Sequence, residues 1–375
     1  MILDWLFGRP VYLPLFIDYA HGAGTVVMTQ IYQSSFLFWI YKIFKSCYRL
    51  LTGTSELYRI CDGAVQAAES ARSKEETELQ TLEAKEGDEK AEKSGRKVKF
   101  VNSKSLSAYV GPAAVYRIDR ALLYSTTLTE VRRQLESPYS TLEEPFAIIL
   151  VKKGFPGNGN PKTPQALILR QCITIIMSSY KLVHELNARA ATKYDPTNRS
   201  HERKLLELWD LMMPDEKLTS RFSDQWQKIG FQGKDPATDF RGMGMLGLDN
   251  LHYYAKHHPH SVQRVLQTSH HPTAWFSMAI VGINITDFAV QLVRTRQLQH
   301  FLYTFGTTTT MFNEFYCYMF DEFGKYWAAQ PMITVMDFGR VFEQFQTRIQ
   351  LELLMSKETV LDPSSPVFLN SKKRL

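Results

Sequence analysis

From about Ser107 onward the apolar residues of this chain recur at helical spacing almost without interruption. In residues 165–190, for example, Leu167, Ile176 and Val183 belong to one apolar face of a long helix. No segment shows the sustained alternation of apolar and polar residues that marks a half-buried strand. The spacing therefore predicts an all-α fold, and no internal repeat is visible.

Residues that begin or end helices bound several of these segments. Thr163 and Pro164 form a start signal, and Pro138 and Pro214 are stop signals. The Gly/Pro-rich segment 154–164 is expected to be a turn. We expect helices over residues 113–135, 165–190, 248–257, 260–268, 273–296, 309–327 and 336–356, and one from Asn198 or Ser200 to just before Pro214.

The segment Ile31–Leu51 is helical in character and dense in aromatic residues. Its uninterrupted apolar run, Phe36–Tyr41, is shorter than the about 20 residues of a spanning helix. We expect a helix that lies in a membrane interface, with a single span and a helix packed on the protein's own core as alternatives. The expected membrane contacts are Phe36, Trp39, Ile40 and Phe44, together with Lys42 and Lys45, which fall on one face with Arg49 and would meet the lipid headgroups.

Composition shifts divide the rest of the chain. Residues 1–28 have no basic segment before their apolar run, so a cleaved secretory signal is not expected. Glu69–Lys97 consists largely of Glu, Lys and Ala and cannot bury enough apolar surface to offset its ordering entropy. We expect an apolar N-terminal region with the interface helix over 1–61, a disordered charged linker over 62–105, a helical part over 106–165, the main domain over 166–350 and a tail over 351–375.

Composition also excludes several classes of function. The 44 Lys and Arg exceed the 38 Asp and Glu by only 6, and the two signs are interspersed, so no nucleic-acid partner is expected. Four widely separated cysteines exclude a disulfide-framed secreted domain and a cysteine zinc site, and favour a reducing compartment. Nothing makes the histidines of 252–271 converge, so we expect no metal site. The G-x-G-x-x-G of 242–247 follows a loop rather than a strand, so no nucleotide cofactor is expected.

The segment Trp226–Tyr254 is the most unusual in the chain, because Gly, Asp, Pro and Thr gather there between two predicted helices. Its embedded Phe231 and Phe240 would anchor an ordered loop, and such loops often carry function. Arg241 is the candidate functional residue. It either pairs with a nearby aspartate to lock the loop or presents its planar fork of donors to a partner's phosphate.

This segment resembles the signature of the ELMO domain. The matching residues are Trp226, Gly230, Phe231, Gln232, Pro236, Thr238, Asp239, Phe240, Arg241, Gly242, Gly244, Gly247 and Leu251. Residues 205–226 resemble the same family. Residues 46–61 do so as well, and they are similar to the short ELMO-domain-containing proteins rather than to the large ELMO scaffolds. The resemblance covers about 170–350 as the domain and most of 31–150 as the N-terminal part of the family.

The resemblance implies a GTPase-activating protein for ADP-ribosylation-factor-like small GTPases, an activator rather than an enzyme in its own right. Arg241 matches the arginine on which that activity depends. The partner GTPase would bind GTP and Mg²⁺, so no cofactor is expected here, and the protein would be cytoplasmic and associated with intracellular membranes. The alternative is a non-catalytic adaptor for a small GTPase or exchange factor, with Arg241 structural. In the catalytic case, Asp239 would orient Arg241. Gln232 would pack in the loop, which we favour, or touch the attacking water.

Overall fold

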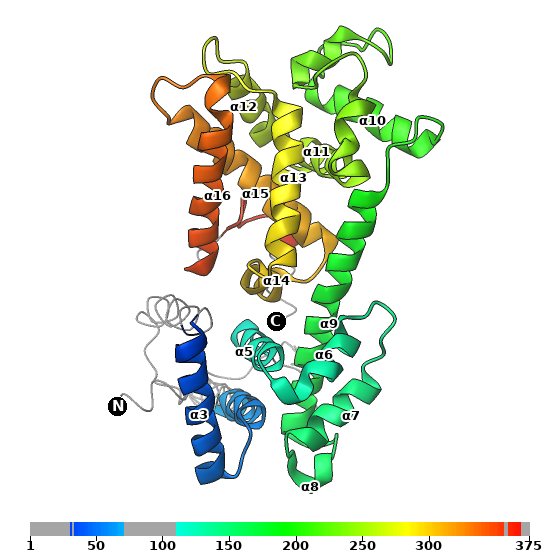
Figure 1. Ribbon diagram of the computed structural model, residues 1–375. Helices are drawn as coiled ribbons and strands as arrows, with labels where there is room; N and C mark the ends of the chain where they lie inside the picture. Colours follow the sequence, from blue (N-terminus) through cyan, green and yellow to red (C-terminus); the bar gives the residue numbers. More distant parts are fainter. Residues whose placement is uncertain (1–30, 32–33, 71–109, 356–358, 369–375) are drawn as a thin grey trace, which may run out of the picture. The chain divides into compact units, whose positions relative to one another are not determined.

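The computed structural model describes residues 31, 34–70, 110–355 and 359–368. These parts are helical and contain no β-strand (Figure 1), so the all-α prediction is confirmed for them. Their contacts form two compact units, which divide between Met177 and Ser178. The division falls in the middle of the long helix α9 (Pro164–Ala191), whereas the sequence suggested a boundary between residues 165 and 166, in its first turn.

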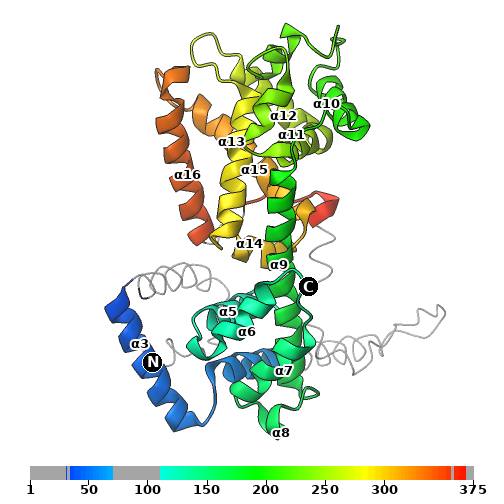
Figure 2. The same cartoon turned by 45° about the vertical axis from the view of Figure 1, so that its right-hand side comes forward.

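The first unit contains a set of mostly short helices and the first part of α9 (Figure 2). Most of its helices bury one apolar face, as Val115, Ile118 and Leu122 illustrate. The elements are α3 (Ser35–Thr52), a helix over residues 56–70, α5 (Pro112–Leu123), η2 (Thr126–Leu128), α6 (Thr129–Glu136), α7 (Glu143–Lys152) and the single turn α8 (Pro156–Gly159).

Two boundary predictions in this unit need correction. The helix expected over 113–135 is broken, because the hydroxyl residues 125–127 form a bend and the 3₁₀ turn η2. The expectation of a disordered linker is wrong for residues 62–70, since these residues continue a helix and Val65 is buried. The remainder of the expected linker, residues 71–105, lies outside the described residues, as do residues 1–30.

Helix α9 is the one described helix that is long and apolar enough to cross a membrane by length and composition alone. Half of its most apolar window is buried within the protein, and Ile168, Cys172 and Ile176 are fully enclosed. Burial of this kind is expected of a helix that packs in the core of the protein. Helix α3, for which a span was one alternative, contains three basic residues and does not meet the same criterion.

In the second unit the helices pack around α13 (Met278–Arg294), whose length is mostly buried (Figure 1). α13 packs against α11 (Gly244–His257) and α15 (Thr309–Ala328), and the fully buried Trp209, Trp226 and Trp327 belong to this core. The remaining elements are α10 (Arg199–Met212), η3 (Asp224–Ile229), η4 (Pro236–Arg241), α12 (Pro259–Ser269), α14 (Gln299–Phe305), η5 (Val335–Asp337) and α16 (Phe338–Leu354).

The helix expected over 248–257 begins one turn earlier, at Gly244, and the one expected from 273 begins at Met278. The tail expected over 351–375 is also partly built into the second unit. Phe368 is buried, and its ring centroid lies 5.3 Å from that of Phe305.

Candidate functional site

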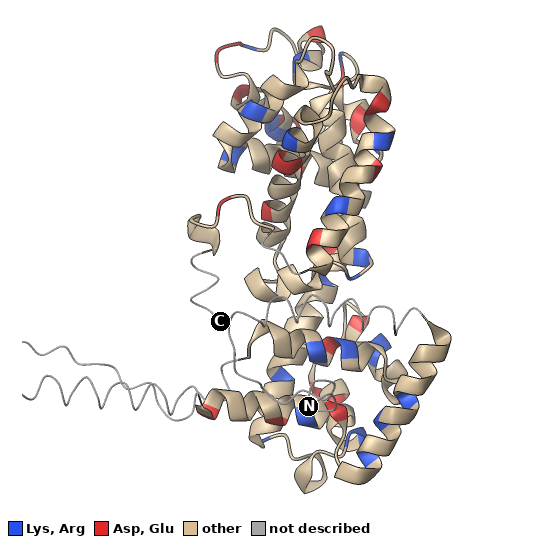
Figure 3. Ribbon diagram, turned by 90° about the vertical axis from the view of Figure 1, so that its left-hand side faces the viewer, with Lys and Arg blue, Asp and Glu red and all other residues tan. Residues whose placement is uncertain are grey.

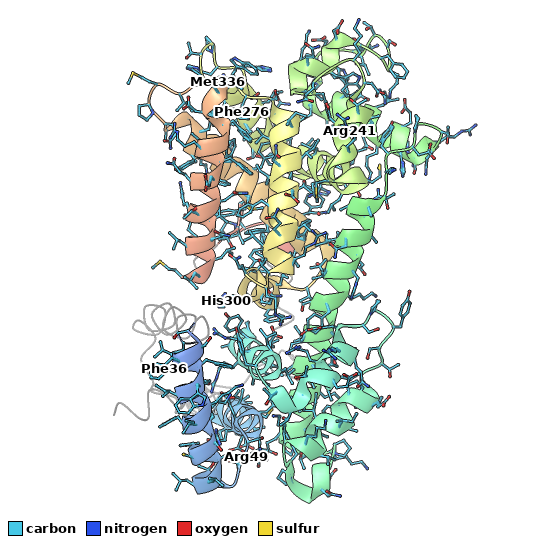
Figure 4. All side chains as sticks on the ribbon, in the orientation of Figure 1. Phe36, Arg49, Arg241, Phe276, His300 and Met336 are labelled. Carbon is cyan, nitrogen blue, oxygen red and sulfur yellow. The ribbon has the colours of Figure 1, made fainter. Side chains whose placement is uncertain are left out.

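The loop between α10 and α11 is ordered by two short 3₁₀ helices, η3 (Asp224–Ile229) and η4 (Pro236–Arg241). The side chains of Ser223 and Asp235 cap them, each accepting a backbone N–H two residues ahead. Arg241 is the last residue of η4, so local backbone structure holds its base in place. Figure 4 shows it labelled in the second unit.

Aromatic side chains anchor this loop to the core. Trp226, Phe231 and Phe240 are all buried. The ring centroids of Trp226 and Phe231 lie 5.8 Å apart, and those of Phe231 and Phe240 5.6 Å. Trp209 of α10 meets Trp226 edge-on, and Tyr194 stacks on Phe240. This frame fixes the residue directly before Arg241.

Two glycines allow the loop backbone to approach its neighbours. Gly230 has φ +88, and a Cβ there would lie 2.1 Å from the backbone nitrogen of Met278. Gly244 has φ +48, and a Cβ there would lie 2.4 Å from the carbonyl oxygens of Ala190 and Thr192. The backbone is therefore close to other elements of the second unit both within the loop, at Gly230, and where the loop joins α11, at Gly244.

A partly buried arginine that no sequence motif marked, Arg221, ties the loop to α10. Arg221 Nη2 donates to Asp235, the η4 cap, at 2.8 Å, and its Nε lies 3.0 Å from Glu202. Burial opposes the charge of Arg221, but its hydrogen bonds to Asp235 and Glu202 outweigh burial and raise its pKa. Tyr194 donates to Glu202 and stacks on Phe240, so one network supports both the cap and the aromatic frame. Its members are 14 and 19 residues apart in sequence, so local spacing gave no signal for it.

Arg241 itself is exposed, and the described part of the chain shows no hydrogen bond or ion pair to its guanidinium. The pairing with an aspartate that the sequence left open is not formed. Asp235 binds Arg221 instead, and Asp239 accepts the Gln232 N–H at 2.9 Å. Burial raises the pKa of Asp239, and attraction to Arg241 opposes this rise at longer range. Asp239 thus fixes the loop backbone and does not hydrogen-bond to Arg241.

The other predicted loop residues divide between burial and exposure. Pro236 is buried at the start of η4, and Thr238 donates to the Asp235 carbonyl from an exposed position. The expectation that Gln232 packs in the loop is wrong, because its side chain is exposed. Gly242 is exposed as well, with φ −76, and a Cβ there would meet nothing within 4 Å.

A pocket of about 520 Å³ lies between α9, α10, α11 and the start of α15. On its wall Asp249 binds both Arg189 and Lys204. Burial alone would raise the pKa of Asp249, but these two cations outweigh it and lower the pKa. Asp249 of α11 is thus paired with a cation from α9 and another from α10, and these ion pairs hold α11 against both helices just after the loop.

The clustered histidines make separate contacts rather than a common site. His258 Nε2 lies 3.0 Å from the buried Glu314, which also accepts the Tyr253 hydroxyl at 2.6 Å. His252 Nε2 lies 3.1 Å from Glu207. In the described parts of the chain, no three His, Cys, Asp or Glu side chains gather as metal ligands would.

The predicted membrane-contact residues belong to α3, which has no buried residue along its length. Phe36, Trp39, Ile40 and Phe44 are exposed. Lys42 is also exposed, with its ammonium 4.6 Å from the ring centroid of Phe38. Lys45 pairs with Glu56 on the following helix, so it faces the first unit and the expected headgroup contact is not supported for this lysine.

The fold and this site define an all-helical domain that presents an exposed arginine from a capped loop anchored by aromatic side chains. Residues 184–342, which include the whole loop, match the model of the ELMO/CED-12 family. The chain is 38% identical over 256 residues to ELMO domain-containing protein 2 of Mus musculus, covering 68% of this chain and 86% of that protein. It is 38% identical over 215 residues to ELMO domain-containing protein 1 of Mus musculus, covering 52% of this chain and 66% of that protein.

A more distant relative is ELMO domain-containing protein B of Dictyostelium discoideum. It is 32% identical over 235 residues, which cover 62% of this chain and 81% of the relative. The chain therefore belongs to the ELMO/CED-12 family, and the resemblance stated from the loop motif is confirmed.

Proposed function

We propose that this chain is a GTPase-activating protein for ADP-ribosylation-factor-like small GTPases and that Arg241 acts as an arginine finger in trans. The observation that carries the proposal is the exposed guanidinium of Arg241, which has no hydrogen bond or ion pair to a described residue and lies at the end of the anchored 3₁₀ helix η4. An arginine that locked the loop would be expected to bind Asp235 or Asp239. In this loop Arg221 performs that task.

The chemistry of GTP hydrolysis suits such a group. Negative charge spreads over the γ-phosphate oxygens in the transition state, and a guanidinium supplied by a second protein stabilises it. The partner GTPase holds the nucleotide, Mg²⁺ and the attacking water. This chain supplies one positive charge whose position is fixed before the encounter, which limits the ordering entropy lost on binding.

Gly242 adds a second line of support. The folded chain gives no steric reason for glycine there, because its φ is ordinary and the space around it is open. A close approach by a partner at residues 241–242 accounts for the lack of a side chain. Gln232 is exposed on the same loop, and its backbone N–H is bound to Asp239. Its side chain is thus available for contact with the GTPase.

The test is single-turnover GTP hydrolysis by a panel of ADP-ribosylation-factor-like GTPases with wild-type protein, Arg241→Ala and Arg241→Lys. An arginine finger supplies about 10³–10⁵ in rate, or roughly 4–7 kcal/mol, so both variants should lose nearly all acceleration. Lysine keeps the charge but lacks the planar fork, and this distinguishes geometry from charge alone.

Arg133→Ala is the matched control, because Arg133 is an exposed arginine of α6 in the first unit. It should keep full acceleration, and all variants should melt within a degree or so of the wild type. Full acceleration by Arg241→Ala would refute the finger. Binding of GTP-loaded GTPase without acceleration by the wild type would instead support the adaptor alternative.

A further inference from the structure

Helix α3 exposes an apolar face that contains no charged residue. Phe36, Trp39, Ile40 and Ile43 lie within one or two turns of each other on one side, and their exposed fractions are 68%, 60%, 44% and 44%. Leu50, near the end of the helix, continues this face and is 83% exposed. We call this the α3 apolar face. An exposed apolar surface of this extent marks an interaction site.

The opposite side of α3 attaches the helix to the first unit. Lys45 pairs with Glu56, and the Tyr41 hydroxyl donates to the same carboxylate at 3.2 Å. The Arg59 guanidinium lies 4.5 Å from the ring centroid of Tyr48. The usual arrangement of an amphipathic helix is therefore reversed, because polar contacts face the protein and apolar groups face outward.

The charges on α3 itself are of one sign, although Glu56 of the next helix neutralises Lys45. The helix carries Lys42, Lys45 and Arg49 and no acidic residue (Figure 3), and Figure 4 labels Phe36 near its beginning and Arg49 near its end. Lys152 and Lys153 at the end of α7 add to this field. Partial burial together with repulsion from Arg49 and Lys45 lowers the pKa of Lys153 to about 8. The apolar face is thus bordered by a positive field.

We propose that the α3 apolar face inserts into a lipid surface that contains anionic headgroups, with α3 parallel to the membrane plane. Apolar side chains enter the boundary of the acyl chains, while the flanking Lys42 and Arg49 meet the headgroups. A second copy of the chain is a poorer occupant, because pairing two such helices would bring like charges together. The sequence had placed Lys45 among the lipid contacts, whereas here it supports the helix from the protein side.

This inference does not depend on the proposed function, since vesicle binding is measured without a GTPase. The full chain is sedimented with vesicles of phosphatidylcholine alone and of phosphatidylcholine with phosphatidylserine. Binding should be stronger to the anionic vesicles and should weaken as salt rises. The double variant Ile40→Ser with Ile43→Ser should bind roughly tenfold more weakly or worse.

The matched control is Leu351→Ser with Met355→Ser, which removes two exposed apolar side chains four residues apart at the end of α16. It should bind as the wild type does. Equal vesicle binding by both double variants, each with a wild-type melting temperature, would overturn the proposal.

Cys47 provides a second readout that identifies the occupant. It lies on the α3 apolar face, seven residues after Ile40, and is exposed, whereas the chain's other three cysteines are buried. A thiol-reactive, environment-sensitive fluorophore on Cys47 should brighten and shift to the blue when anionic vesicles are added. A signal that is already high and insensitive to vesicles would mean that the chain covers its own face. A signal that follows protein concentration instead would mean a second copy. Either result would overturn the proposal.

Discussion

The loop of residues 226–244 and helix α3 present opposite chemistry at their surfaces. In the loop, Phe240 is buried while its neighbour Arg241 is exposed and unpaired in the described part of the chain. In α3, Lys45 is held by Glu56 and Trp39 is exposed. Each region therefore exposes a group that the described part of the chain does not bury. The comparison teaches that an exposed group suggests the chemistry of its partner, and on this basis we propose an anion for the loop and an apolar phase for α3.

The largest effect on stability is expected from two glycines of the loop, one enclosed by other elements and one with open space around it. Gly230→Ala should destabilise the second unit by more than about 3 kcal/mol, because its Cβ would overlap the Met278 backbone and φ is positive. Gly242→Ala should leave stability unchanged or slightly raised, because nothing lies near the new methyl group. Denaturant unfolding of both variants measures the difference.

The two glycine variants also distinguish an effect on folding from an effect on GTPase activation. If residues 241–242 meet a partner closely, Gly242→Ala should reduce GTPase activation although it folds normally. A Gly242→Ala protein that unfolds as readily as Gly230→Ala would contradict the geometry given for the loop.

A smaller effect is expected where two isoleucines of the first unit are compared. Ile173 of α9 is fully buried, so Ile173→Ala should cost about 2–5 kcal/mol. Ile40 on the α3 apolar face is exposed, so Ile40→Ala should change the free energy of unfolding by less than about 0.5 kcal/mol. Thermal and denaturant unfolding without lipid test this. A cost of several kcal/mol at Ile40 would show that the face is packed against the protein.

The smallest effect concerns the charge of Arg241. Burial raises the pKa of Asp239, and Arg241 opposes this rise. Arg241→Ala should therefore raise the pKa of Asp239 further, as measured by the pH titration of its carboxyl carbon by NMR. An unchanged pKa would mean that the guanidinium does not act on this carboxylate.

The raised pKa of Asp239 also makes the free energy of unfolding depend on pH. Asp239 has a higher pKa in the folded than in the unfolded state, so its ionisation destabilises the fold. Its contribution to stability is greatest below the unfolded value of about 3.9 and declines as the pH rises through the raised folded value. In Arg241→Ala this decline should be steeper.

Much of the fold could be predicted from helical periodicity, because most helices from α9 onward repeat apolar residues at helical spacing. The short helix α14 was not predicted, because its 7 residues give only about two turns of pattern. The break between α5 and α6 was missed although hydroxyl residues interrupt the apolar pattern at 125–127. Helix α7 was missed because its apolar run shows no clear face, and Phe146, Ile149 and Leu150 are all buried.

The candidate loop could be located from its motif, but its internal support could not. The partners of Arg221 come from α10 and from the η4 cap, and only the tertiary fold brings them together. Likewise, the spacing of Lys42, Lys45 and Arg49 indicates a common side of α3. Whether that side faces the protein or the solvent depends on Glu56 of the next helix, which pairs with Lys45. The pattern within α3 alone does not give this contact.

The central claim is that the exposed guanidinium of Arg241 acts on a partner's phosphate. The most direct measurement is the single-turnover rate of GTP hydrolysis by a responsive ADP-ribosylation-factor-like GTPase, with wild-type protein and with Arg241→Ala at equal melting temperature. We predict that acceleration falls by about 10³-fold or more toward the intrinsic rate, while binding of the GTP-loaded GTPase is retained. Undiminished acceleration by Arg241→Ala would contradict the account.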